Sequence, residues 1–138
     1  MIYSQNRDDQ RAFLINAWNK FKENHILNDI ELQLVDIIKI HPEFHELIED
    51  RKVKCPSYDL NLNPFLHINL HLAVREQIAI NQPLEIKKIY KKILSKFNDT
   101  HQAEHAIMNC LFNCLADAQR KNDNLNLSNY NKCLHNII

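Results

Sequence analysis

Apolar residues recur every three or four positions through most of the chain, which is the spacing of helices with one buried face. We expect a first helix over residues 8–22, with an apolar stripe of Phe13, Leu14, Ala17, Trp18 and Phe21. A second helix is expected after Asn28, because Glu31 three residues later completes a capping-box pattern. Its buried face is expected to carry Leu27, Ile30, Leu34, Ile37 and Ile38. Pro42 lacks a backbone N–H, so this helix should kink or restart there.

Prolines mark the later segments. Residues 51–63 have the composition of a loop, and the pair Asn63-Pro64 is typical of a helix start. The helix that should follow, to about Ile80, is apolar on nearly all sides, as buried central helices are. Further helices are expected from Pro83, with lysines on the solvent side, and over residues 99–120, where Asp99 with Gln102 is expected to form the cap. A short last helix is expected to bury Tyr130, Leu134 and Ile137.

The chain contains no glycine. Turns that need a positive φ must therefore use Asn or Asp, which favours helices joined by short loops over a hairpin-rich β fold. We find no internal repeat and no linker. The sequence therefore predicts an all-α protein with a single domain over residues 1–138, folded as an antiparallel bundle of about five to six helices.

The balance of charges and the cysteine content indicate which kinds of partner and which cell compartment to expect. Lys+Arg and Asp+Glu balance at 17 each, which argues against a nucleic-acid binder and against attachment to an anionic membrane. No window has the roughly 18 apolar residues of a membrane span, and the first residues lack a secretory-signal pattern. The four cysteines, Cys55, Cys110, Cys114 and Cys133, follow no disulfide framework. We expect reduced thiols and a cytoplasmic location, with a homo-oligomer allowed and no organic cofactor or protein partner indicated.

Six of the eight histidines form His-x-x-x-His pairs: His41/His45, His67/His71 and His101/His105. Residues four apart lie on one helix face, so each pair could bind one metal ion. Each pair continues an apolar stripe and should face the interior, with Glu104 beside the last pair and Asp50 and Glu76 near the others. Mixed histidine and carboxylate ligands are typical of metal sites in helical bundles. We predict an iron, manganese or zinc site with the ligands His41, His45, His67, His71, His101, His105 and Glu104.

Two other interpretations stay open. The histidines also fit a buried histidine–carboxylate network without metal, in a non-enzymatic structural or interaction protein. They also fit a pH-responsive structure, because clustered histidines protonate below about pH 6. An open coordination position would allow hydrolysis or oxygen and redox chemistry, so whether the protein is an enzyme stays undecided. Cys110 and Cys114 are expected to be small core residues, and His25 and His135 surface residues.

Several segments resemble the bacterial domain-of-unknown-function family 1841. They are His-Pro-Glu-Phe-His at 41–45, Asn-Pro-Phe-Leu-His at 63–67, Leu-His-Leu-Ala-Val-Arg-Glu-Gln at 70–77, His-x-Ala-Glu-His-Ala-Ile-Met at 101–108 and Ala-Gln-Arg at 118–120. The likeness covers about residues 11–120. It implies a small bacterial cytosolic protein, with no activity, substrate or cofactor attached. The family pattern carries the six paired histidines, and usually has Glu where this chain has Asn109.

Overall fold

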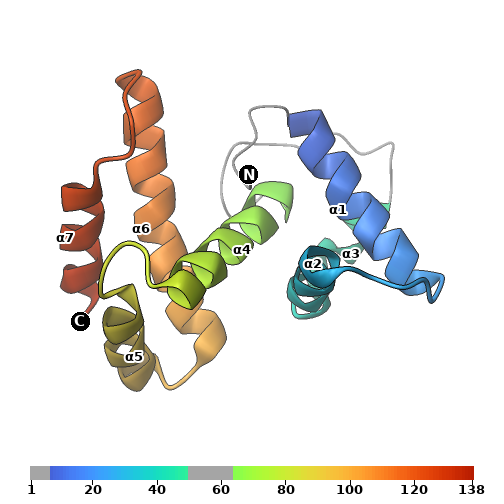
Figure 1. Cartoon of the computed structure of the whole chain (residues 1–138), viewed down its shortest axis with the longest axis horizontal. Coiled ribbons are helices and arrows are strands. Elements are labelled where there is room, and N and C mark those ends of the chain that lie inside the picture. The colour runs from blue at the N-terminus through green and yellow to red at the C-terminus, as the bar shows by residue number, and fades with distance from the viewer. Residues whose placement is uncertain (1–6, 50–63) are drawn as a thin grey trace. The chain divides into compact units, whose positions relative to one another are not determined.

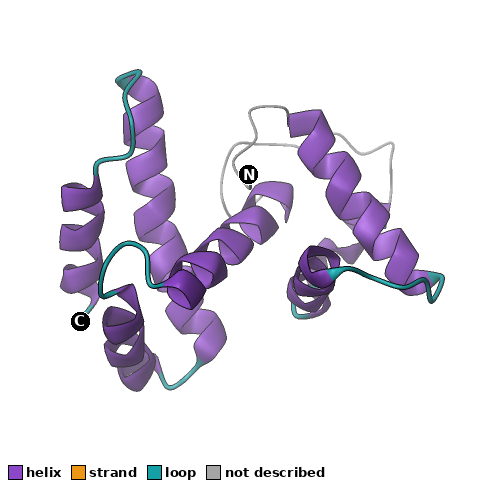
Figure 2. Cartoon of the chain, viewed as in Figure 1, coloured by secondary structure: helices purple, strands orange, loops and turns teal. Residues whose placement is uncertain are grey.

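A computed structural model describes residues 7–49 and 64–138, and all regular structure in these ranges is helical (Figures 1 and 2). The elements are α1 (Arg7–Lys22), α2 (Asp29–Lys39), the 3₁₀ turn η1 (Pro42–Phe44), α3 (His45–Glu49), α4 (Pro64–Ile80), α5 (Ile86–Phe97), α6 (Thr100–Arg120) and α7 (Leu127–Ile137). The predicted all-α class, with helices packed on helices, is confirmed. The expected loop at 51–63, with its Asn63 cap, lies outside the described residues.

The chain divides into two compact units, Met1–Leu72 and Ala73–Ile138, and the division falls inside the continuous helix α4. A single domain over residues 1–138 stays a prediction. None of the described helices is long and apolar enough to cross a membrane.

In the first unit, α1 packs against α2, and both contribute to a core that also includes the beginning of α4. The buried side chains include Leu14, Ala17, Trp18, Leu34, Val35, Ile37, Ile38, Phe44, Ile48, Phe65, Ile68 and Leu72. The capping box is confirmed: the Asn28 side chain accepts from the Glu31 amide, and the Glu31 side chain accepts from the Asn28 amide. Glu31 also pairs with Lys20 at 2.9 Å, which connects α2 to α1.

Two residues that we expected inside this unit are exposed. Phe13 is 44% exposed and Ile30 is 52% exposed. Each lies about a quarter turn from the centre of the stripe that its helix buries, because successive residues are about 100° apart around a helix. The expected stripes were therefore wider than the faces that pack.

In the second unit, α6 and α7 form an antiparallel helical hairpin that α5 packs against (Figure 1). The core includes Val74, Ile86, Ile89, Ile93, Ala103, Ile107, Met108, Leu111, Tyr130 and Leu134. A disulfide joins Cys110 on α6 to Cys133 on α7, so the expectation of reduced thiols is wrong for these two residues. Cys114 is free, and Cys55 lies outside the described residues.

Helix ends follow local sequence closely. Asp99 caps α6 as predicted, accepting from the amides of His101 and Gln102. Among the described residues, Asn occupies the positive-φ positions 24, 81, 98 and 122, as expected for a chain without glycine. Glu85 occupies a fifth such position, so the expectation that Asn or Asp must fill them is wrong there. The predicted start of α5 at Pro83 is wrong, because residues 83–85 form a turn and the helix begins at Ile86. The lysines of α5 are exposed, as expected.

Candidate metal centre

Three histidines come together in the first unit. His67 and His71 lie one turn apart on α4, and His41 lies between α2 and η1. The Nε2 atom of His41 is 3.0 Å from Nε2 of His67 and 3.1 Å from Nε2 of His71. All three side chains are buried, at 1%, 6% and 0% exposure in chain order. Three imidazole nitrogens therefore converge on one buried point, and we call these residues the histidine trio.

Pro42 explains how His41 is held. In an uninterrupted helix, the carbonyl of Ile38 would accept the N–H of residue 42, but proline has none. The helix α2 ends at Lys39, and the backbone N–H of His41 donates to the Ile38 carbonyl at 3.0 Å rather than to the Ile37 carbonyl. Both carbonyls then also accept imidazole N–H groups. His41 Nδ1 donates to the Ile37 carbonyl at 2.8 Å, and His45 Nε2 donates to the Ile38 carbonyl at 2.8 Å.

These bonds determine the tautomer of His41. A carbonyl oxygen only accepts, so the proton of the neutral ring is on Nδ1 and Nε2 carries a lone pair. That lone pair faces His67 and His71, where it could accept their N–H groups or bind an ion. Phe44 stacks on the His41 ring, with 5.3 Å between centroids and 10° between planes, and restricts its rotation. The His41 side chain therefore presents Nε2 to His67 and His71.

The His45 ring has other partners than the histidine trio. Its Nε2 is engaged by the Ile38 carbonyl, and its ring packs 4.8 Å from that of Trp18. The side chain is only half-buried. The His41/His45 pair was expected to act as a unit on one helix face. The break at Pro42 separates the two rings, so only His41 joins α4.

The third pair lies in the second unit, near the start of α6. The rings of His101 and His105 are 4.2 Å apart between centroids, and both residues are half-buried. The two histidines were expected to face the interior and are only partly buried. The buried face of α6 instead carries Ala103, Glu104, Ile107, Met108, Cys110 and Leu111. The pair keeps the spacing and proximity that two ligands of one ion need.

Glu104 is buried and held by an arginine. Arg75 Nε donates to Oε1 at 2.6 Å, and Arg75 Nη2 donates to Oε2 at 3.3 Å. This bidentate ion pair neutralises the carboxylate of Glu104, a residue that is 4% exposed. It also connects the C-terminal part of α4 to α6. Burial raises the pKa of the nearby Tyr90, and the charge of Glu104 raises it further. Glu104, expected as a ligand or its supporting partner, is thus the partner of Arg75.

The remaining candidates lie away from these groups. Glu76 and Asn109 are exposed, as are His25 and His135, which were expected at the surface. Asp50 lies outside the described residues. Sequence reasoning missed the Ile37 carbonyl and Phe44, which hold His41. The signal was Pro42: its missing N–H ends the regular helical pattern, and the His41 amide donates to the Ile38 carbonyl, which leaves the Ile37 carbonyl for the imidazole.

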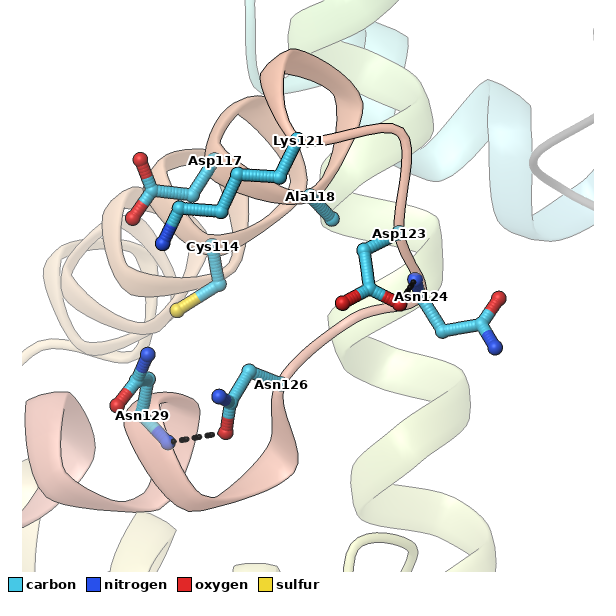
Figure 3. Close-up of a pocket in the computed structure, with 8 residues that line it drawn as sticks. All are labelled: Cys114, Asp117, Ala118, Lys121, Asp123, Asn124, Asn126 and Asn129. Atoms are coloured by element: carbon cyan, nitrogen blue, oxygen red, sulfur yellow. Dashed lines mark hydrogen bonds between the residues drawn. The ribbon is translucent and has the colours of Figure 1, made fainter.

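A small pocket opens between α6 and α7 (Figure 3). Cys114, Asp117 and Lys121 line one side, and Asn126 and Asn129 the other. Its volume of about 90 Å³ is far below the roughly 300–1,000 Å³ of ordinary ligand pockets. Burial raises the pKa of the Cys114 thiol, which makes it a weaker nucleophile at neutral pH. The pocket therefore supports no ligand or reaction.

Comparison with known proteins finds one family. The family model described as "Domain of unknown function (DUF1841)" matches residues 6–136, nearly the whole chain. No curated protein and no solved structure matches the chain.

Proposed function

The chain belongs to the DUF1841 family, and because that description assigns no activity, we propose a function from the geometry of the histidines: the protein binds a divalent transition-metal ion. The observation that carries this proposal is the convergence of three buried Nε2 atoms in the histidine trio. Neutral imidazole is a common ligand of zinc and iron, and the sequence also allowed manganese. No reaction is proposed for the bound ion.

The trio has the properties of a preformed ligand set. His67 and His71 come from one rigid helix, and His41 is oriented by its bond to the Ile37 carbonyl. Such bonds to the second ring nitrogen orient metal-binding histidines and raise their basicity. Burial also favours the neutral imidazole that a metal requires.

His101 and His105 are a second candidate pair of ligands. The sequence-based expectation of His101 and His105 as ligands, with Glu104 as ligand or supporting partner, is part of the proposal. It is tested separately from the trio, with the double variant His101→Ala/His105→Ala.

The second candidate function is the non-enzymatic interaction protein with a polar core and no metal. One observation favours it: the lone pair of His41 Nε2 could accept N–H groups from His67 and His71, and Arg75 neutralises Glu104. The Nε2 atoms of the trio and the Glu104 carboxylate would then have hydrogen-bond partners without an ion. The absence of a nucleic-acid partner and the cytoplasmic location also stay predictions. The Cys110–Cys133 disulfide removes the cysteine argument for that location, since such bonds are rare in the cytosol.

The deciding experiment is elemental analysis of the protein purified without a His tag or chelator. One or two equivalents of a transition metal per chain, lost in the variant His67→Ala/His71→Ala, would support the proposal. The matched control is His25→Ala/His135→Ala, which removes two exposed histidines and should keep the metal. Metal well below one equivalent, also after reconstitution with iron, manganese and zinc, would favour the polar network without metal.

A further inference from the structure

Helix α5 concentrates positive charge on one exposed face. It carries five lysines and no acidic residue. Its buried side chains are Ile86, Ile89 and Ile93, and the opposite face exposes Lys87, Lys88, Lys91 and Lys92. In the described part of the chain, none of these four lysines has an ion-pair partner, and the fifth, Lys96, donates to the Ile137 carbonyl. We call the four exposed residues the lysine face.

The lysines of this face repel one another. Residues four apart are neighbours on a helix, so Lys87 lies beside Lys91 and Lys88 lies beside Lys92. Like charges at this spacing destabilise a helix, and the burial of the α5 isoleucines has to offset their repulsion. A negatively charged partner surface would replace the repulsion with attraction. The lysine face is therefore suited to an acidic partner.

The first unit carries the opposite charge. Residues 29–49, from α2 through η1 to α3, contain six acidic residues and one lysine, for a net charge of −5 against +5 for α5. Glu31 and Glu49 pair with lysines of α1. The other four carboxylates are exposed and have no ion pair among the described residues: Asp29, Asp36, Glu43 and Glu46. These carboxylates match the lysine face in number and are opposite to it in sign.

The outer face of α2 also offers apolar surface. Asp29 and Asp36 lie two turns apart, on the side of the helix opposite the buried Leu34 and Ile38. The same side exposes Leu32 at 48% and Ile40 at 42%, and we call these two residues and the two aspartates the acidic face of α2. Lysine stems cover apolar side chains while their ammonium groups reach carboxylates. A helix rich in lysine therefore fits both components of this face.

We propose that the lysine face of one copy docks on the acidic face of α2 in a second copy of the chain. Because the formal net charge of the chain is zero at pH 7, two copies have no net repulsion that would oppose this contact. The two surfaces differ and each copy offers both, so the contact is head to tail and assembly gives rings or open chains. The contact involves none of the histidines and is independent of the proposed metal site.

Analytical ultracentrifugation of the full chain at neutral pH tests for this self-association. At about 0.01 M salt, where charges act over about 30 Å, the weight-average mass should exceed that of one chain and rise with protein concentration. At about 1 M salt, where the range is about 3 Å, the dissociation constant should be at least about tenfold higher. A chain that stays monomeric at low salt, or an assembly that salt does not weaken, would overturn the proposal.

Charge reversal assigns the contact to α5. The variant Lys87→Glu/Lys91→Glu should lose self-association at low salt, with its helical content checked by circular dichroism. The matched control is Lys121→Glu/Lys132→Glu, which makes the same change in net charge at exposed lysines outside α5 and should still associate. Self-association that persists unchanged in the folded α5 variant, or that both variants lose equally, would count against the lysine face.

A charge swap tests the two faces together. The variant Asp29→Lys/Asp36→Lys should also lose self-association, because both of its faces are then basic. Mixed in equal amounts with Lys87→Glu/Lys91→Glu, it should associate again, since each reversed face meets a face of opposite charge on the other variant. A mixture of the two folded variants that stays monomeric would overturn the pairing of α5 with α2.

Discussion

His41 illustrates how the position of one proton determines what a side chain can do. Because its Nδ1 donates to the Ile37 carbonyl, its Nε2 must present a lone pair to the other two histidines. His45 uses its Nε2 in the same kind of bond to the Ile38 carbonyl. Two histidines of one His-x-x-x-His pair therefore have different roles, and the ring nitrogen that bonds to the backbone makes the difference.

Glu49 provides a residue-scale prediction on pH. Its Oε1 accepts from Nε1 of Trp18, the single tryptophan, and from Lys22 Nζ, both at 3.0 Å. These bonds hold the pKa of Glu49 below its ordinary value. A lowered folded-state pKa contributes stability above the unfolded pKa of about 4.3, and that stability is lost as the pH falls through the folded value. We expect the free energy of unfolding in urea to fall from about pH 5 to about pH 3.

The matched variant for this prediction is Glu49→Gln, which cannot ionise. Its unfolding free energy should depend less steeply on pH over the same range. Part of the dependence should remain, because bonds to the Asn28 amide and Lys20 also lower the pKa of Glu31. Trp18 fluorescence reports the change at the indole directly. Equal losses of stability in wild type and variant would show that the Glu49 bonds contribute nothing.

At the scale of elements, the ends of the helices orient side chains and form capping hydrogen bonds. The end of α2 orients two imidazoles, and Asp99 and Asn28 supply the first amides of α6 and α2 with acceptors. These features depend on unpaired backbone groups at helix termini, which need partners wherever they are buried. A change at a terminus can therefore affect a site in another helix.

Pro42→Ala tests this link. An N–H at residue 42 could bond to the Ile38 carbonyl and extend α2, which would move His41 and displace His45 from that carbonyl. We expect the affinity for Co²⁺ to fall about tenfold or more, the usual effect of losing a supporting partner of a ligand. The control is Pro64→Ala, at the first position of α4, where no N–H is needed. A Pro42→Ala protein with wild-type affinity would mean that the break does not orient the ligand.

Asn28→Ala is a prediction about the capping box of α2. It removes the side-chain oxygen that accepts from the Glu31 amide. The variant should lose about 1 kcal/mol of unfolding free energy, measured by denaturant titration. Asn28→Asp preserves the acceptor and should be close to wild type. A loss of similar size in both variants would point to a role of Asn28 other than capping.

At the scale of the whole molecule, the two units have different means of stabilisation. The first has the apolar core that includes Trp18, and Phe44 of this core packs against His41 and His67 of the histidine trio. The second has the Arg75–Glu104 ion pair, a bond from Tyr130 to Gln77, and the disulfide between α6 and α7. A perturbation that acts on one of these features should therefore affect its own unit first.

The disulfide gives the prediction at this scale. It closes a loop over a sequence separation of 23, for which the chain-entropy model assigns about 3 kcal/mol. The variant Cys133→Ser, or reduction, should destabilise α6 and α7 by about that amount. Amide hydrogen exchange should show faster exchange in these helices and little change in α1 and α2. Cys114→Ser is the control, since Cys114 is free, and uniform loss of protection over both units would contradict the prediction.

The sequence by itself determined what depends on neighbours within one or two helical turns. The all-α class, the Asn28 and Asp99 caps, the break at Pro42 and the Asn residues in turns were all predicted from local patterns. The His67/His71 pair was also evident, because a spacing of four on a helix brings two rings to one face. Local geometry is enough for such features, since every partner lies nearby in the chain.

Only the tertiary structure decided which distant residues meet. His41 contacts His67, Glu104 pairs with Arg75, and Cys110 bonds to Cys133, and the partners in these three pairs are 23 to 29 residues apart in the chain. His45 instead donates to the Ile38 carbonyl. Periodicity shows the face on which a side chain lies only to within about a quarter turn, as Phe13 and Ile30 demonstrate. Hydrogen bonds and metal ligands require atoms placed within a fraction of an ångström. Packing between helices provides that placement, and so the fold decides which distant residues become partners.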